Sequence, residues 1–119
     1  MPDDAPLTRG FSALGIDERT HVVAYDDEGG GRAARLLWTL EVAGHKHYSL
    51  LNGGLHAWVN EGHTLETTAA IPTAKTFQVR RNNAPLADST YISTRLGNED
   101  CRLQDARSPD EYNGIKKYD

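Results

Sequence analysis

Apolar positions along the chain fall into short runs and one helical repeat, and they predict alternating strands and helices. Residues 21–25 (HVVAY) and 48–51 (YSLL) are continuous apolar runs, typical of strands that are buried on both faces. Between them, residues 32–43 are expected to be helical, because Ala33, Leu36, Leu37 and Leu40 recur at the spacing of one helix face.

Two more helices are predicted beside these elements. Residues 7–15 are typical of the end of an amphipathic helix that stops at Gly15. After the second strand, residues 52–54 (NGG) turn the chain into a helix, LHAWVNE, which ends before Gly62. The order strand, helix, strand, helix favours an α/β fold, with a parallel sheet and helices that flank it.

The pattern changes after Gly62, where Thr, Ala, Pro and Asn become frequent and periodicity fades. We therefore expect a linker over residues 63–88, in which TFQVR (76–80) alternates like a short strand. Residues 89–96 predict a short helix and residues 101–106 (CRLQDA) a third strand. A further helix is expected to begin there, because Ser108 and Glu111 form a capping-box pattern with Pro109 at the first helical position.

These elements divide the chain into three expected parts. Residues 1–62 form a first part-domain, residues 63–88 the linker, and residues 89–119 the start of a second domain that could also pack with the first. One alternative is that residues 101–106 join the sheet of the two earlier strands. Another is that the unpaired strand edges lead to self-association between chains.

Composition narrows the classes of function. The 119 residues carry a net charge of −4, which argues against a nucleic-acid-binding surface or attachment to an anionic membrane. No stretch has the length of a transmembrane helix, and the N-terminus lacks the pattern of a signal peptide. Cys101 is the only cysteine, so an internal disulfide is impossible and a cytoplasmic location is expected.

The most conspicuous candidate site is the loop that joins the first strand to its helix. Asp26, Asp27 and Glu28 precede Gly29, Gly30 and Gly31. Three carboxylates would repel a phosphate, and no phosphate-loop motif is present. Adjacent side chains seldom converge on a metal, so we expect no metal and no cofactor here. A solvated acidic loop at a helix N-terminus is the simplest interpretation.

Other candidate residues carry weaker signals. The five histidines lack the partners of a zinc signature and are interpreted as surface or turn residues. Cys101 lies among acidic neighbours, so an inert thiol is favoured over a nucleophile or a persulfide carrier. Asp105 and Arg107 follow the third predicted strand. They could orient an anion, but a structural ion pair is the favoured interpretation.

Three of these segments together carry a family resemblance. VVAYDDEGGG, LLNGGLHAW and LQDARSPDEYNG resemble the two-domain rhodaneses, the thiosulfate sulfurtransferases, over about residues 10 to 114. The first two segments are similar to the second half of the family's first domain, and the last to the opening of its second domain. The chain is therefore expected to be a middle fragment of such an enzyme.

The resemblance implies a reaction and a place for it. In the family, a loop cysteine of the second domain takes sulfur from thiosulfate as a persulfide and passes it to cyanide or a thiol. Asp26 stands at the cysteine position of the first-domain loop, and an aspartate cannot form a persulfide. The second-domain cysteine would lie beyond Asp119, so the chain alone is expected to be inactive, with thiosulfate the expected donor of the parent enzyme.

An alternative function is a non-catalytic rhodanese-like module for binding or regulation. The reading frame distinguishes the two: coding sequence that continues past Asp119 to a cysteine loop would favour the enzyme, and a stop codon would favour the module.

Overall fold

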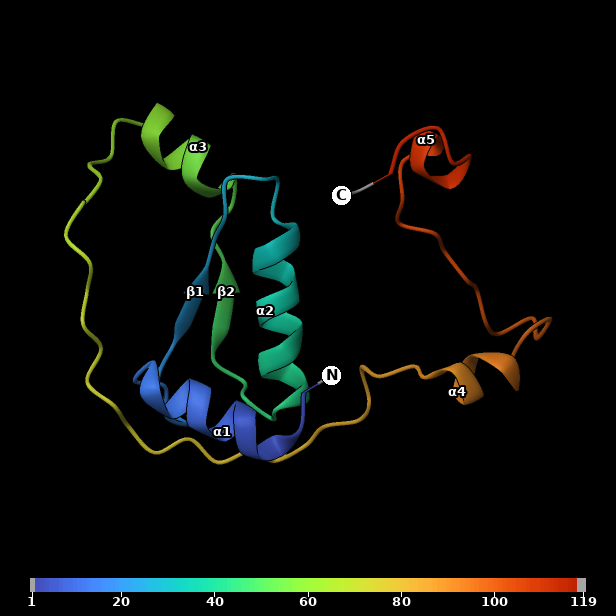
Figure 1. Cartoon of the computed structure of the whole chain (residues 1–119), viewed down its shortest axis with the longest axis horizontal. Coiled ribbons are helices and arrows are strands. Elements are labelled where there is room, and N and C mark those ends of the chain that lie inside the picture. Colours follow the sequence, from blue (N-terminus) through green and yellow to red (C-terminus); the bar gives the residue numbers. More distant parts are fainter. Residues whose placement is uncertain (1, 118–119) are drawn as a thin grey trace. The chain divides into compact units, whose positions relative to one another are not determined.

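The computed structural model describes residues 2–117, which separate into two compact units, Met1–Leu86 (unit 1) and Ala87–Asp119 (unit 2). Unit 1 holds the helices and strands in the order α1 (Asp4–Ala13), β1 (Val22–Ala24), α2 (Gly31–Val42), β2 (Tyr48–Leu50) and α3 (Gly54–Asn60) (Figure 1). Unit 2 holds α4 (Ser89–Ser93) and α5 (Pro109–Tyr112). None of the helices in the described residues is long and apolar enough to cross a bilayer.

The two strands of unit 1 form the predicted parallel sheet. Val22 lies opposite Tyr48 and Ala24 opposite Leu50, and α2 makes the crossover between the strands and packs against both. Figure 1 shows α2 alongside the strands and α3 at their carboxyl end. The α/β fold class is thereby confirmed in an incomplete form, because the sheet has only these two strands in the part of the chain described.

Helix α2 supplies several of the buried residues of the core. Ala33, Leu40 and Val42 are buried on α2, whereas Leu36, which the helical spacing placed on the same face, is largely exposed. The central cluster consists of Phe11, Ile16, Leu40, Ala43 and Phe77, with Leu7, Val22, Leu37, Tyr48 and Val79 packed around it. The core thus draws on residues from both ends of unit 1.

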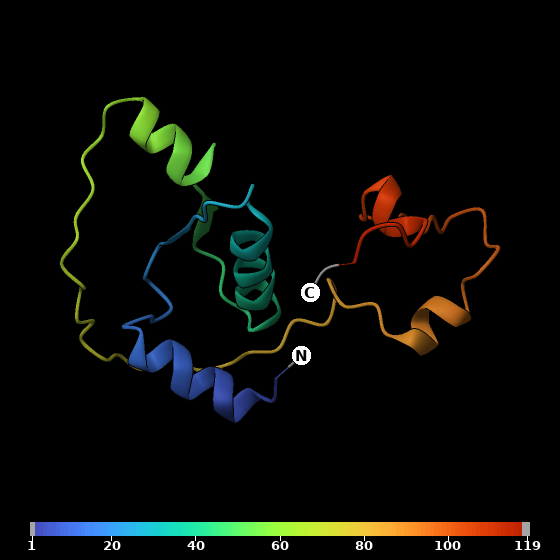
Figure 2. The same cartoon turned by 45° about the horizontal axis from the view of Figure 1, so that its top comes forward.

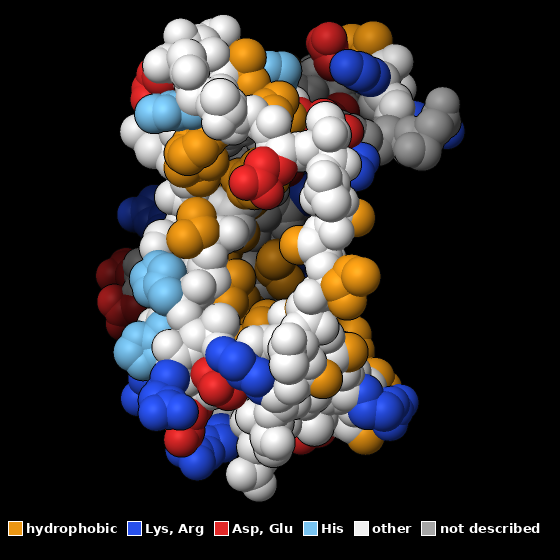
Figure 3. All heavy atoms as spheres, turned by 90° about the vertical axis from the view of Figure 1, so that its left-hand side faces the viewer, with side chains coloured by type: hydrophobic (Ala, Val, Ile, Leu, Met, Phe, Trp, Pro, Cys, Tyr) orange, Lys and Arg blue, Asp and Glu red, His pale blue; other side chains and the backbone are white. Residues whose placement is uncertain are grey.

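The opposite face of the sheet is open in the described residues. Neighbouring strand residues point to opposite faces, so the buried Ala24 faces α2 while Val23 faces away from it. Val23 is 54% exposed. Figure 3 shows hydrophobic side chains open to solvent on the side of the molecule along which the chain descends after α3. Parallel sheets are normally covered on both faces, so this unit shows only part of such an architecture.

The chain between α3 and unit 2 is extended and irregular, and its second half packs onto the ends of α1 and α2. We call residues 75–82 the strap. Lys75 N donates to Ser12 O at 3.0 Å, Arg80 N to Ala43 O at 2.9 Å and Asn82 N to Val42 O at 2.8 Å. Figures 1 and 2 show this segment passing along α1.

The predicted strand at residues 76–80 is therefore wrong. The alternation is real, because Phe77 is buried and Val79 partly buried between more exposed neighbours. However, a strand requires a ladder of backbone hydrogen bonds, and the strap makes isolated bonds to the carboxyl ends of α1 and α2. Alternating burial here reports packing against helices rather than pairing in a sheet.

The predicted third strand at residues 101–106 is also wrong. This segment is extended but pairs with no strand in the described residues, and it does not join β1 and β2. None of residues 87–117 is buried, so unit 2 has no core within the described residues against which a strand could pack. The capping box at Ser108 and Glu111 is confirmed, with Pro109 at the start of α5.

Candidate functional site

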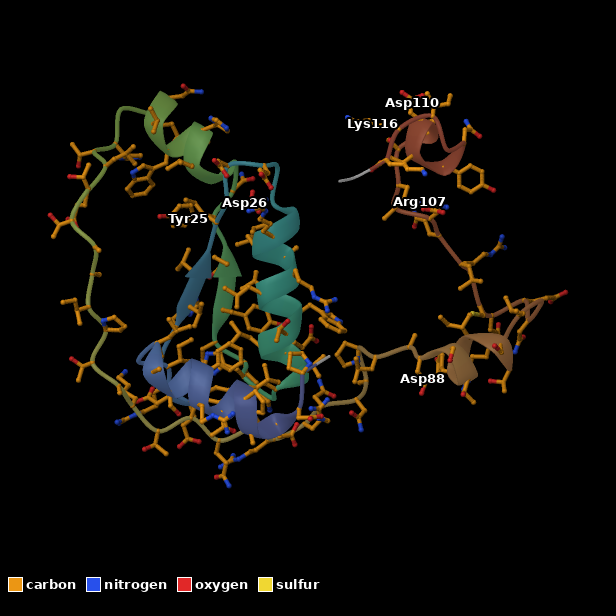
Figure 4. The ribbon with its side chains drawn as sticks, viewed as in Figure 1. Tyr25, Asp26, Asp88, Arg107, Asp110 and Lys116 are labelled. Atoms are coloured by element: carbon orange, nitrogen blue, oxygen red, sulfur yellow. The ribbon has the colours of Figure 1, made fainter. Side chains whose placement is uncertain are left out.

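The glycine-rich loop lies at the carboxyl ends of the two parallel strands, where α/β sheets usually place their ligands. A hollow of about 270 Å³ opens there. Figure 4 shows Tyr25 and Asp26 at this end of β1, where the loop to α2 begins. The hollow is lined by Tyr25, Asp26, Gly29, Gly30, Leu50, Leu51, Asn52, Gly53, Gly54 and His56.

Asp26 is the residue around which the loop is built. Its Oδ1 accepts hydrogen bonds from the backbone N–H of Glu28 at 3.0 Å and of Gly30 at 2.7 Å, and its Oδ2 accepts from Ala33 N at 2.9 Å. Ala33 belongs to the first turn of α2, so the carboxylate satisfies an N–H group that the helix itself leaves unpaired. The loop therefore folds its backbone amides onto one negative side chain of its own.

These contacts set the charge of Asp26. The backbone hydrogen bonds from Ala33 and Gly30 favour the ionised form and lower the pKa of Asp26 below its ordinary value of 3.8. The N-terminal end of the α2 dipole favours the same charge. Near neutral pH this end of the loop thus carries a fixed carboxylate.

The turn after β2 is tied to the same loop. Leu55 N donates to the backbone oxygen of Asp26 at 3.1 Å, and His56 Nε2 lies 3.1 Å from the backbone oxygen of Asp27. These bonds place α3 against the loop. Sequence reasoning did not single out Tyr25, Asn52 or His56 as lining residues. For Tyr25 and Asn52, the signal available was their position at the ends of the two predicted strands, and His56 lies in the first turn of the helix that follows.

The other acidic residues of the loop do not share the role of Asp26. Asp27 contributes only its backbone oxygen, and Glu28 forms an exposed ion pair with Arg32 at 2.7 Å. Within residues 2–117, no group of three or more His, Cys, Asp and Glu side chains comes together to hold a metal. One of the three carboxylates therefore organises the loop, and the other two face solvent.

The histidines differ from the expectation at one position. His45 was interpreted as a surface or turn residue, but it is only 4% exposed. Its Nε2–H donates to Thr20 O at 2.9 Å and to His47 O at 3.1 Å, which joins the chain segments that precede the two strands. The interpretation is wrong for His45, because these two carbonyls supply the partners that let an imidazole be buried.

Unit 2 holds the remaining candidate pair and the single cysteine. Arg107 donates to both carboxylate oxygens of Asp105, with Nη2 to Oδ2 at 2.6 Å, and Figure 4 shows Arg107 on the chain that leads to α5. Hydrogen bonds from Arg107 lower the pKa of Asp105 to about 2. Cys101 is a free, partly buried thiol. The geometry is that of a local ion pair beside a turn.

Together, the fold and the loop define an α/β domain that places its site at the carboxyl ends of parallel strands and turns backbone N–H groups onto one side chain. The model of the Rhodanese-like domain family matches residues 2–61, about half of the chain. This chain belongs to the rhodanese family.

Several of the relatives found by sequence are named thiosulfate sulfurtransferases. A thiosulfate sulfurtransferase of Pseudomonas aeruginosa is 40% identical over 116 residues, and one of Azotobacter vinelandii is 42% identical over 116 residues. A thiosulfate sulfurtransferase of Bos taurus is 33% identical over 118 residues. Each match covers 98% of this chain but only 40–43% of the relative. The chain thus spans about two fifths of the length of the curated relatives it matches.

Asp26→Asn should reduce the thermal stability of unit 1 at neutral pH, and the reduction should disappear in acid. The folded-state pKa is lowered, so the stabilisation is present above the unfolded pKa of about 4 and is lost as the pH falls through the folded value. We expect a decrease in Tm of roughly 4–8 °C at pH 7, the scale expected for one lost cap in a unit of this size. Thermal melts from pH 7 down to about pH 2.5 measure it.

The matched control is Asp27→Asn, which removes one negative charge from a side chain that makes no hydrogen bond in the described residues. It should leave Tm within about 1 °C of the parent. Equal losses in the two variants, or a loss for Asp26→Asn that stays constant down to the lowest pH, would contradict the role given to the Asp26 carboxylate.

Proposed function

We propose that this chain is the non-catalytic rhodanese portion of a thiosulfate sulfurtransferase, with Asp26 at the position where such a domain carries its sulfur-bearing cysteine. The observation that carries the proposal is the set of three backbone N–H groups that converge on the Asp26 carboxylate. Converging amides of this kind would stabilise a thiolate or a persulfide. The activity for which the relatives are named supports the choice of thiosulfate as donor.

The chemistry explains why this loop would be inert. A cysteine thiolate attacks the outer sulfur of thiosulfate, the new S–S bond forms as the old one breaks, and sulfite leaves with the electron pair. A carboxylate at the same place cannot hold a sulfane sulfur. It also occupies the N–H groups that would receive the anion, and its charge repels thiosulfate.

The proposed enzyme needs its cysteine elsewhere. Cys101 follows a turn in unit 2 and does not lie in a loop between a strand and a helix, as Asp26 does. We place the reactive cysteine in the second rhodanese domain, whose opening would include Asp105 and Arg107, in sequence beyond Asp119. The greater length of the relatives supports that placement.

A thiocyanate assay with the purified chain tests the proposal. We expect no thiosulfate-dependent thiocyanate above the buffer background, and no sulfur adduct on Cys101 by peptide mass mapping. Asp26→Cys, made with Cys101→Ser, should gain the mass of one sulfur atom at residue 26 after incubation with thiosulfate. Turnover by the parent chain near that of a full-length enzyme would overturn the assignment, and so would an Asp26→Cys loop that takes up no sulfur.

The second candidate is a rhodanese-like module that binds or regulates without catalysis, and the closed Asp26 loop favours it equally. A stop codon directly after Asp119 in the gene would support the module, and an open frame leading to a cysteine loop would support the enzyme. Self-association through the edges of β1 and β2, and a cytoplasmic location inferred from the single cysteine, stay predictions.

A further inference from the structure

A second hollow lies at the other end of the sheet, away from the Asp26 loop. It has a volume of about 500 Å³, a size common for ligand sites. One wall is the turn at residues 17–19 and the other is the strap, with Gly44 and His45 between them. The strap contributes Thr76, Phe77, Gln78 and Arg80 to this groove.

The strap, which lines this groove, carries unpaired backbone groups. Phe77 N donates to Ser12 Oγ at 3.0 Å, and Arg80 N donates to Ala43 O, so these amides face the protein. Within residues 2–117, the N–H groups of Thr76, Gln78, Val79 and Arg81 donate to no other residue, and no carbonyl oxygen of residues 76–80 accepts a hydrogen bond. An extended segment with free donors and acceptors is the backbone template used in β-strand addition.

The rim of the groove favours a negative partner. The exposed Arg19 makes no ion pair within the part of the chain that the structure describes. Arg80 lies 3.7 Å from Glu18, and both side chains are largely exposed, so this pair is weak. Asp17 is engaged by the Thr20 hydroxyl at 2.7 Å and by Lys75 at 3.5 Å. Arg19 is thus free to receive a carboxylate, and Arg80 could do so only by leaving Glu18.

We propose that the groove between residues 17–19 and the strap binds an extended acidic peptide segment, which adds along the free edge of Thr76–Gln78. The peptide exchanges backbone hydrogen bonds with the outward groups of Thr76 and Gln78, and its acidic side chain reaches Arg19. A second copy of the strap is a poorer occupant, because antiparallel pairing centred on Gln78 would bring Lys75 close to Arg81 of the other copy.

Fluorescence anisotropy with a labelled peptide on the full chain tests this inference. The probe is Ac-Thr-Glu-Val-Glu-Val-Thr-NH₂, and the controls are its Glu→Lys analogue and an analogue N-methylated at alternate amides. We expect both analogues to bind at least about tenfold more weakly. N-methylation removes donors without changing side chains, so equal binding by that analogue would overturn strand addition. Absence of binding up to about 1 mM would do the same.

Variants of the chain locate the binding. Gln78→Pro removes one outward N–H that makes no bond in the described structure, and proline favours the extended conformation that the preceding Phe77 already has. We expect it to reduce peptide binding at least about tenfold, whereas Gln78→Ala, which keeps the N–H, should not. Arg19→Gln should weaken binding of the acidic peptide but not binding of its Glu→Lys analogue.

Sedimentation identifies the competing occupant. A monomeric parent chain that binds the peptide supports the inference. A parent chain that self-associates through the strap, with Gln78→Pro monomeric and the peptide unable to compete, would replace the peptide with a second copy and overturn it. These readouts use no sulfur transfer, so their outcome is independent of the proposed enzymatic role.

Discussion

Replacing Phe77 with alanine is expected to lower the free energy of unfolding of unit 1 by about 3–5 kcal/mol. Phe77 is 4% exposed, and its ring meets that of Phe11 edge to face at a centroid distance of 5.0 Å. Removing it leaves a cavity against the central cluster and weakens the attachment of the strap. Urea unfolding followed by tryptophan fluorescence measures the change.

Ile71→Ala is the matched control for Phe77→Ala. Ile71 belongs to the same extended chain but is 94% exposed, so its loss should change the free energy of unfolding by less than about 0.5 kcal/mol. A loss below about 1 kcal/mol for Phe77→Ala would show that the strap is not part of the core.

Gly54→Ala is expected to lower the free energy of unfolding by about 2–4 kcal/mol and to loosen the Asp26 loop. Gly54 has φ of +59°, and a Cβ there would lie 2.5 Å from the backbone oxygen of Asp26. Because Asp26 O is a backbone atom and the backbone of residue 54 fixes the position of its Cβ, the loop or the start of α3 must shift, and the bond from Leu55 N to Asp26 O is lost. Chemical denaturation gives the size of the effect, and hydrogen exchange at Leu55 reports the bond.

Gly54→Ala combines two costs, the left-handed backbone conformation of alanine and the clash of its Cβ with Asp26 O, and Gly29→Ala is the control that carries only the first. Gly29 also has a positive φ, +88°, but a Cβ there meets nothing within 4 Å. Its substitution should therefore cost only the left-handed conformation of alanine, about 1–2 kcal/mol. If the free energy of unfolding fell equally in both variants, the close approach between Gly54 and Asp26 would make no contribution to stability.

The strand and helix order of unit 1 could be predicted from the sequence because its signals are local. Continuous apolar runs marked β1 and β2, and helical spacing marked α2. The failures at residues 76–80 and 101–106 share one cause. A strand exists only when another strand pairs with it, and the apolar pattern of a segment does not reveal whether a partner is present. Phe77 shows the same limit, since the residue that buries it, Phe11, lies far away in sequence.

The candidate site was predictable in position and not in detail. Strand, glycine-rich turn and helix located it, and the family resemblance drew attention to Asp26. That Asp26 would hold three amides while its neighbours Asp27 and Glu28 face solvent depends on the exact path of the loop. Three adjacent acidic residues look alike in a sequence, and only the backbone geometry distinguishes them.

The strap has a consequence for synthesis on the ribosome. The family match ends at residue 61, yet Phe77 completes the core and the last strap bond is made by Asn82. A nascent chain that has emerged only as far as residue 62 would carry Phe11 and Ile16 without Phe77, the later member of their cluster. Unit 1 is thus expected to reach its final stability only after some twenty further residues have emerged, and during that interval its apolar groups are available to chaperones.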